Sequence, residues 1–143
     1  MASNTLKTYS PDKIIITVGA YTLTGAADGT FVTIEAMTDG VASEAGAYGD
    51  TARAMSLDRR HTITATLQQT SDSNTVLSGL YQADRVSGGN GTFPVSVVDL
   101  RGQTLFAGEG WVRKQAPSTF SKGLEAKEWA IEAVGDYVAG GNL

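Results

Sequence analysis

Apolar and polar residues alternate most regularly between residues 62 and 69. Ile63, Ala65 and Leu67 are separated by a polar set consisting of Thr62, Thr64, Thr66 and Gln68. This period of two is typical of a β-strand with one dry and one wet face. The pattern then changes to helical spacing, with apolar residues at Val76, Leu77, Leu80 and Tyr81. We predict a helix at about residues 72–86, capped by Ser71 or Ser73, that packs on a sheet or covers a sheet edge.

The same alternation predicts further strands before and after this strand and helix in the sequence. They are expected at residues 13–18, 31–37, 93–100, 103–114 and 127–134, with residues 21–24 returning as a hairpin. Gly108 and Gly110 interrupt the longest run, and there they predict a bulge or a sharp bend. Trp111 and Trp129 fall within strand patterns and are expected in the core. The predicted fold class is mainly β, an antiparallel β-sandwich or barrel with one flanking α-helix.

Residues 38–57 are the least regular part of the chain. They read TDGVASEAGAYGDTARAMSL and are rich in small residues. A connection of about twenty residues is uncommon inside a compact domain and usually reflects function or disorder. We predict a long inter-strand loop here. The alternative is a mobile surface hairpin that has no partner.

Composition narrows the class of protein. A chain of 143 residues with 41% hydrophobic and 18% charged residues predicts one folded domain over residues 1–143. The absence of cysteine excludes disulfides, thiol nucleophiles and cysteine-ligated zinc. The N-terminus lacks the pattern of a signal peptide, and the run 14–16 is too short to span a bilayer, so no membrane partner is expected. A net charge of −4 argues against general nucleic-acid binding.

Catalytic and metal-binding patterns are weak. His61 is the only histidine, no Gly-x-Ser-x-Gly motif accompanies it, and its neighbours Arg59 and Arg60 indicate a surface or interface residue. The segment Asp72-Ser73-Asn74 opens like a calcium loop, but Leu77 stands where that loop needs glycine. Scattered carboxylates would allow an acid/base pair, yet nothing in the sequence brings two together. We therefore predict no enzyme, no metal and no cofactor.

The polar strand faces carry more information. Thr62, Thr64, Thr66 and Gln68 form a continuous wet row, and other strands add the acidic residues Glu35, Glu128 and Glu132. One interpretation is a sheet face open to solvent, which is common in antiparallel sheets. The other is the wet and mildly acidic interior of a barrel or ring.

Three segments in order, together covering most of the chain, carry a family resemblance. They are KTYSPDKIIITVGAYTLTGAADGTFVTIE, RAMSLDRRHTITATLQQTSDSNTVLSGLYQAD and KGLEAKEWAIEAVGDYVAGGN. In order and spacing they resemble the tail-tube, or inner-tube, proteins of contractile-tailed bacteriophages. The resemblance implies a subunit that forms six-membered rings, which stack into a tube inside a contractile sheath. A type VI secretion-like tube protein and a virion β-sandwich binding module remain alternatives.

The resemblance also implies partners and a location. The partners are further copies of the chain, a sheath protein outside, and tape-measure protein or DNA transiently in the lumen. No sequence-specific nucleic-acid binding is implied. The location is the virion tail, assembled in the host cytoplasm. Six subunits with four strands each give a ring circumference of roughly 115 Å and a diameter of roughly 37 Å, which admits a duplex roughly 20 Å wide.

Two sets of site residues follow from this family interpretation. The segment 38–57 is expected to contact the next ring, through candidates Asp39, Glu44, Tyr48, Asp50, Arg53 and Met55. The lumen-facing candidates are Glu35, Thr62, Thr64, Thr66, Gln68, Glu128 and Glu132. An acidic or neutral lumen repels phosphate, so DNA slides through it without binding.

Overall fold

The computed structural model describes residues 6, 8–102 and 104–140 of the chain. In this part, a short 3-10 helix, η1 (Pro11–Lys13), and one α-helix, α1 (Ser73–Val86), accompany nine strands. The strands are β1 (Ile14–Val18), β2 (Tyr21–Thr22), β3 (Val32–Ala36), β4 (Val41–Ala45), β5 (Thr51–Met55), β6 (Arg60–Leu67), β7 (Phe93–Asp99), β8 (Thr104–Lys114) and β9 (Lys127–Tyr137). The prediction of a mainly β protein with one flanking α-helix is confirmed.

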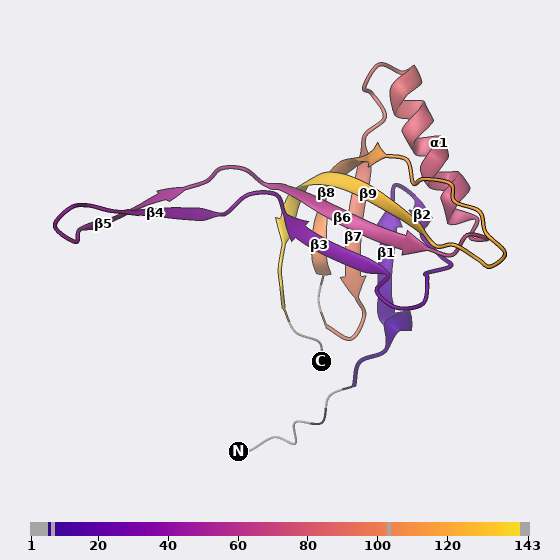
Figure 1. Ribbon diagram of the computed structural model, residues 1–143, viewed down its shortest axis with the longest axis horizontal. Helices are drawn as coiled ribbons and strands as arrows, with labels where there is room; N and C mark the ends of the chain where they lie inside the picture. The colour runs from indigo at the N-terminus through magenta and orange to yellow at the C-terminus, as the bar shows by residue number, and fades with distance from the viewer. Residues whose placement is uncertain (1–5, 7, 103, 141–143) are drawn as a thin grey trace.

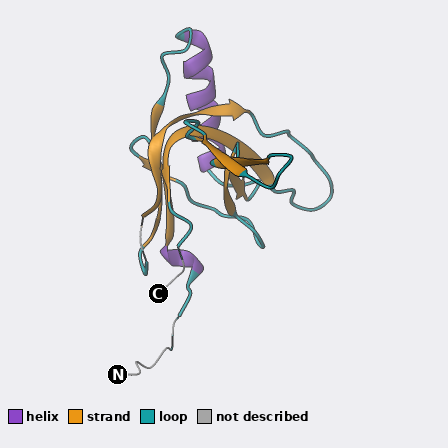
Figure 2. Cartoon of the chain, turned by 90° about the vertical axis from the view of Figure 1, so that its left-hand side faces the viewer, coloured by secondary structure: helices purple, strands orange, loops and turns teal. Residues whose placement is uncertain are grey.

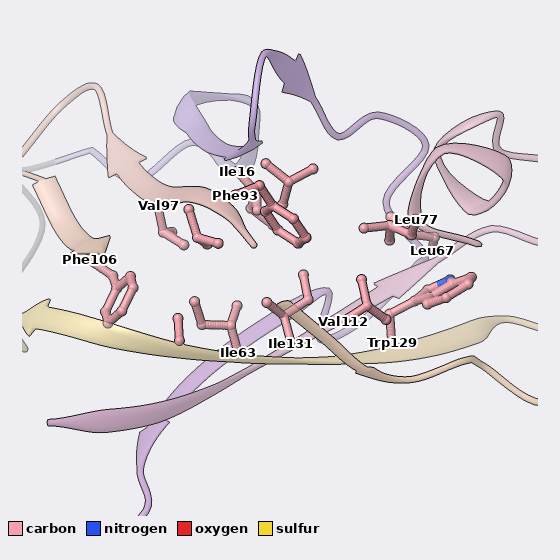
Figure 3. Packing of buried hydrophobic residues seen from close by; sticks show 13 residues of the cluster. Ile16, Ile63, Leu67, Leu77, Phe93, Val97, Phe106, Val112, Trp129 and Ile131 are labelled. Carbon is pink, nitrogen blue, oxygen red and sulfur yellow. The ribbon is translucent and has the colours of Figure 1, made fainter. Parts of the chain in front are cut away.

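Seven of the strands form one antiparallel sheet in the order β2-β1-β7-β8-β9-β6-β3, and β4 pairs with β5 alone (Figure 1). The large sheet is strongly curved (Figure 2), so that core side chains of β1 and β7 face those of β6, β8 and β9 (Figure 3). Within the described residues, β2 and β3 end the sheet without pairing to each other. Of the two predicted architectures, a β-sandwich or a barrel, the fold is therefore sandwich-like and not a closed barrel.

The core fills the space between these two layers. Figure 3 shows Val97, Phe93 and Ile16 on one side, facing Ile63, Ile131 and Val112 on the other. Ile63 pairs with Ile131 across β6 and β9, and both are fully buried. Burying a side chain of this size stabilises the fold by about 1.5–3 kcal/mol. The strict alternation of β6 therefore places all its apolar side chains in the core.

Helix α1 packs one apolar stripe on the sheet, as the sequence predicted. Leu77 is fully buried within the core, and Leu80 and Tyr81 are half-buried against it. The predicted cap at Ser71 is confirmed in part: Asp72 directly precedes the helix and its side chain makes no capping bond, but the hydroxyl of Ser71 accepts a hydrogen bond from the amide of Ser73, the first helical residue, at 3.2 Å. Ser73 itself is not a cap. The hydroxyl of Ser73 instead accepts a hydrogen bond from the Thr24 amide at 2.8 Å, so the helix start is tied to the segment after β2.

The two tryptophans occupy different environments. Trp129 is buried, as expected, and its indole N–H donates to the side-chain oxygen of Asn74 at 2.9 Å. Trp111 is only half-buried and pairs with Glu132 on the opposite face of the sheet from the core. The expectation of Trp111 in the core is wrong because β8 alternates, with Gly110 and Val112 buried on the core side and Trp111 between them on the polar side.

Strand β8 is irregular, but not where its glycines predicted a bulge. The pairing shifts by one residue at Leu105, opposite β7, and at Arg113, opposite β9. Gly108 and Gly110 pair in regular register. These glycines instead allow the backbones of β8 and β9 to approach each other closely. A Cβ on Gly108 would lie 2.3 Å from the carbonyl oxygen of Val134.

The predicted loop at residues 38–57 is also wrong in its local structure. Strands β4 and β5 pair over five residues each, from Val41 opposite Met55 to Ala45 opposite Thr51. The turn between them is closed by the Gly46 amide donating to the Asp50 carbonyl, with Gly49 at a φ of +92°. The segment is thus a hairpin that projects from the sheet (Figure 1). The two strands could not be predicted from the sequence, because the small side chains of this segment show no alternation of large apolar and polar residues.

Candidate functional site

The predicted lumen residues share one face of the sheet. The register aligns Glu35 of β3 with Thr62 of β6, and Thr62 with Glu132 of β9. The next rows place Thr33 beside Thr64, and Thr66 beside Glu128. Gln68 is exposed and lies one residue beyond the end of β6. Because cross-strand partners point to the same side, these residues form one surface on the side away from the core, which we call the polar face.

One basic residue on this face was not anticipated. The guanidinium of Arg113 lies 3.9 Å from the carboxylate of Glu132 and 3.5 Å from the hydroxyl of Thr62. The side chain of Glu132 is 13% exposed and that of Arg113 is 44% exposed. Arg113 therefore partly neutralises the least exposed carboxylate of the polar face. Arg113 follows the buried Val112 and so falls on the same side as Trp111, at the position where the pairing of β8 with β9 shifts by one residue.

Carboxylates outnumber cations on the polar face. By the strand register, its acidic residues on β3, β8 and β9 are Glu35, Glu109, Glu128, Glu132 and Asp136. Its basic residues on β6 and β8 are Arg60, Arg113 and Lys114. Arg60 is engaged by Asp58 at 2.9 Å, and Arg59 pairs with Asp136 at 2.6 Å. The face is mildly acidic and threonine-rich, which suits a wall that does not bind phosphate.

The hairpin formed by β4, β5 and their turn (residues 41–55) has two different faces. Val41 pairs with Met55 and Ser43 with Arg53 on one face. The other face carries only Glu44 among alanines. All residues from 41 to 55 are exposed, including Tyr48 at the turn, which is 98% exposed. The candidates for inter-ring contact are therefore divided: Asp39 before β4, Glu44 on the alanine face, Tyr48 and Asp50 at the turn, and Arg53 and Met55 on the opposite face.

Asp58 holds the base of this hairpin. Its carboxylate accepts hydrogen bonds from the hydroxyl of Thr38 at 3.2 Å and from the backbone and guanidinium of Arg60 at 2.9–3.2 Å. Hydrogen bonds from Arg60 hold the pKa of Asp58 well below its ordinary value. The same pair raises the pKa of Arg60. The two ends of the hairpin are thereby joined by one ionised carboxylate.

His61 is buried beside this base, which corrects the expectation of a surface or interface residue. It is 9% exposed, and its ring packs edge-on against Phe106 and Tyr137, with ring centroids 5.3 and 5.7 Å away. Its Nδ1 lies 2.9 Å from the carbonyl oxygen of Arg59, which fixes a protonated Nδ1. His61 thus anchors the strand that leaves the hairpin.

Comparison with known proteins fits these features. Residues 8–138 match the family described as Bacteriophage PhiTE tail tube protein. The chain belongs to this tail tube family. It is also similar to "Structural protein ORF10" of Pseudomonas phage KPP10, with 28% identity over 151 aligned positions that cover 99% of this chain and 87% of the relative.

Membership in the tail tube family confirms part of the sequence interpretation. The protein is a structural protein of a phage tail tube, and its family implies self-assembly into a tube in the virion tail. This favours the phage interpretation over the secretion-system tube and the virion binding module. Neither helix in the described part of the chain combines the length and apolar character needed to cross a membrane.

Proposed function

We propose that the whole chain, residues 1–143, acts as one tail-tube domain that forms hexameric rings, and that these rings stack into the inner tube of a contractile tail. The polar face lines the bore through which DNA passes during ejection. The tape-measure protein occupies the bore before DNA, a sheath protein surrounds the tube, and assembly takes place in the host cytoplasm. The observation that carries this proposal is the continuous polar face across β8, β9, β6 and β3.

The edge of the sheet supports ring formation. The amide of Thr66 donates to the carbonyl of Phe31, and the amide of Met37 donates to the carbonyl of Arg60. Hydrogen-bonded positions alternate along an antiparallel pair, so Val32, Ile34 and Ala36 direct their backbone groups away from β6. An unpaired edge is a template for another chain. Pairing with a neighbouring subunit satisfies this edge in a closed ring.

The width of the polar face supports a bore of the right size. Four adjacent strands per subunit, in a ring of six, give the diameter of roughly 37 Å expected for passage of a duplex. Their mildly acidic surface repels the phosphate backbone, since basic walls would bind DNA with salt-dependent affinity. The strands therefore supply both the wall and its charge.

The projecting hairpin supports contact between rings. A two-stranded hairpin with no third strand is marginally stable in water. Its exposed Val41 and Met55, 43% and 68% exposed, gain apolar burial only against another surface. The next ring of the stack provides such a surface, and docking there stabilises the hairpin.

Electron microscopy combined with hydrogen exchange tests this function. Negative staining of the concentrated protein, and of tails assembled with it, is expected to show annuli with an open centre and stacks of them. Backbone amides of residues 41–55 are expected to exchange rapidly in soluble subunits and slowly in the stacks. The sheet amides of β6 serve as an internal control because they are protected in both states. Absence of annuli, or equal exchange of the hairpin in both states, would contradict the proposal.

A further inference from the structure

A groove runs beside the part of β1 that β2 leaves uncovered. It encloses about 510 Å³, and its apolar lining includes Ile14, Ile16, Leu23, Phe31 and Leu67. Strand β2 pairs only with Thr17 and Val18, and the Leu23 amide adds one bond to Ile16. On this edge, the N-terminal part of β1 is therefore flanked by side chains and not by a second strand. We call this the β1-edge groove.

The charges of the groove have a single sign. Of its lining residues, only Asp12 and Asp28 are charged. Asp12 accepts a hydrogen bond from Ser10, whereas Asp28 accepts one from the adjacent Gly29 amide at 3.1 Å. Among the residues that the structure describes, neither forms an ion pair within 4.0 Å. The groove therefore suits an apolar ligand that carries a cation.

One face of the hairpin has this composition. Val41 and Met55 form a cross-strand pair, and Arg53, two residues from Met55, points to the same side. Arg53 is the only Lys or Arg in residues 38–57 of the sequence. In the described chain it makes no ion pair within 4.0 Å. An apolar pair with one arginine matches an apolar groove with aspartates at its rim.

The positions of the two features favour a second copy of the chain as the occupant. Figure 1 shows the hairpin leaving one side of the sheet, whereas the connection between β2 and β3, which forms the groove wall, lies on the other side. A hairpin cannot fill the groove of its own chain from there. A protrusion and a complementary recess on opposite sides of one molecule produce head-to-tail contacts, which generate open-ended stacks.

We infer that the β1-edge groove receives the hairpin of a second copy in the adjacent ring, with Val41 and Met55 on its apolar floor and Arg53 paired with Asp28. This inference rests on the proposed function, and it specifies where the hairpin binds and which of its faces does so. The alanine face with Glu44 points away from the groove, since a carboxylate there would meet Asp12 and Asp28.

Thiol cross-linking tests the contact, because the chain has no cysteine of its own. The double variant Arg53→Cys/Asp28→Cys is assembled into stacks and treated with a short bis-maleimide, which spans the reach of an Arg–Asp pair better than a disulfide. A ladder of covalently linked multimers is expected. The matched control, Glu44→Cys/Asp28→Cys, places its hairpin thiol on the other face and should give at least fivefold less product. Stacks that form without the ladder, or equal ladders in both variants, would overturn the inference and leave the proposed function standing.

Charge reversal gives an independent measurement. Arg53→Glu and Asp28→Arg are each expected to reduce the fraction of protein in stacks several-fold, and the combined variant is expected to restore it. Failure of the combined variant to recover, with soluble subunits folded by circular dichroism, would contradict the Arg53–Asp28 pairing. Absence of stacks from the unmodified chain would contradict the proposed function itself, and with it this inference.

Discussion

The carboxylate of Asp58 accepts a hydrogen bond from the hydroxyl of Thr38 at 3.2 Å, and this bond joins the two ends of the projecting hairpin. The same carboxylate binds Arg60 at the start of β6. The hairpin therefore leaves the sheet from a base closed by this carboxylate together with the backbone bond from the Ser56 amide to the Gly40 carbonyl at 2.9 Å. A base of this kind limits the directions in which the hairpin can point, which reduces the entropy lost when it docks.

Replacing Asp58 with alanine should loosen the hairpin without unfolding the sheet. We expect faster hydrogen exchange of residues 41–55 in the soluble subunit and a several-fold lower yield of stacks. The melting temperature should change little, because the pair with Arg60 is at the surface. Asp39→Ala removes a charge from the same segment without breaking the base, and it serves as the control for hydrogen exchange in the soluble subunit. Equal exchange in the two variants would show that Asp58 does not hold the hairpin.

The effect of pH on the hairpin base follows from the lowered pKa of Asp58. A carboxyl group whose pKa is depressed by folding contributes stability above its unfolded pKa, near 3.8, and loses it as pH falls through the lower folded value. The base should therefore stay intact from neutral pH down to pH 3.8. An NMR titration of the Asp58 carboxyl carbon should give a midpoint below 3.8 in the intact chain. A midpoint at or above that value would contradict the hydrogen bonding described.

The charge of the polar face is best tested at Glu128. Glu132 is a poor choice, because it is 13% exposed and faces Arg113, so a lysine there would also disturb packing. Glu128 is exposed and lies opposite Thr66. Glu128→Lys should leave tube assembly intact and slow genome ejection, since the bore then attracts phosphate. Asp72→Lys makes the same charge change at the N-cap of α1, off the polar face and at a side chain that makes no capping bond, and should leave ejection unchanged. Unchanged ejection in the Glu128 variant would argue against a position in the bore.

Close backbone contact between β8 and β9 makes Gly135 sensitive to substitution. A Cβ at Gly135 would lie 2.2 Å from the carbonyl oxygen of Ala107. We expect Gly135→Ala to reduce the free energy of unfolding by about 1–3 kcal/mol, because the strands must separate. The same substitution at Gly79, in α1 with open space around it, should stabilise by about 0.5–1 kcal/mol. Urea denaturation measures both. Equal effects at the two sites would contradict the close approach.

Large alternating side chains made part of this fold predictable. Ile63, Ala65 and Leu67 revealed β6 and its polar opposite face, and Leu77 with Leu80 revealed the helix. The strand register then brought six of the seven bore candidates onto one face, with Gln68 just beyond it. Whether they line a bore is still a prediction.

Other features depend on pairing that the sequence does not encode locally. For residues 38–57 a loop was predicted and a surface hairpin was only the alternative, because alanine, serine and glycine show no contrast between the two faces of the hairpin. The bulge at Arg113 depends on how β8 meets β9. The role of Asp58 at the hairpin base could not be predicted from the sequence, since its partner Thr38 lies at the other end of the hairpin. Its position two residues before an arginine at a strand start was the one available hint.

A cryo-electron microscopy reconstruction of the assembled tail tests the central claim most directly. The account predicts hexameric rings in which the polar face, with Glu35, Thr64 and Glu128, points toward the tube axis and each hairpin contacts the next ring. A reconstruction in which β3, β6 and β9 turn this face outward, or bury it between subunits, would contradict the account.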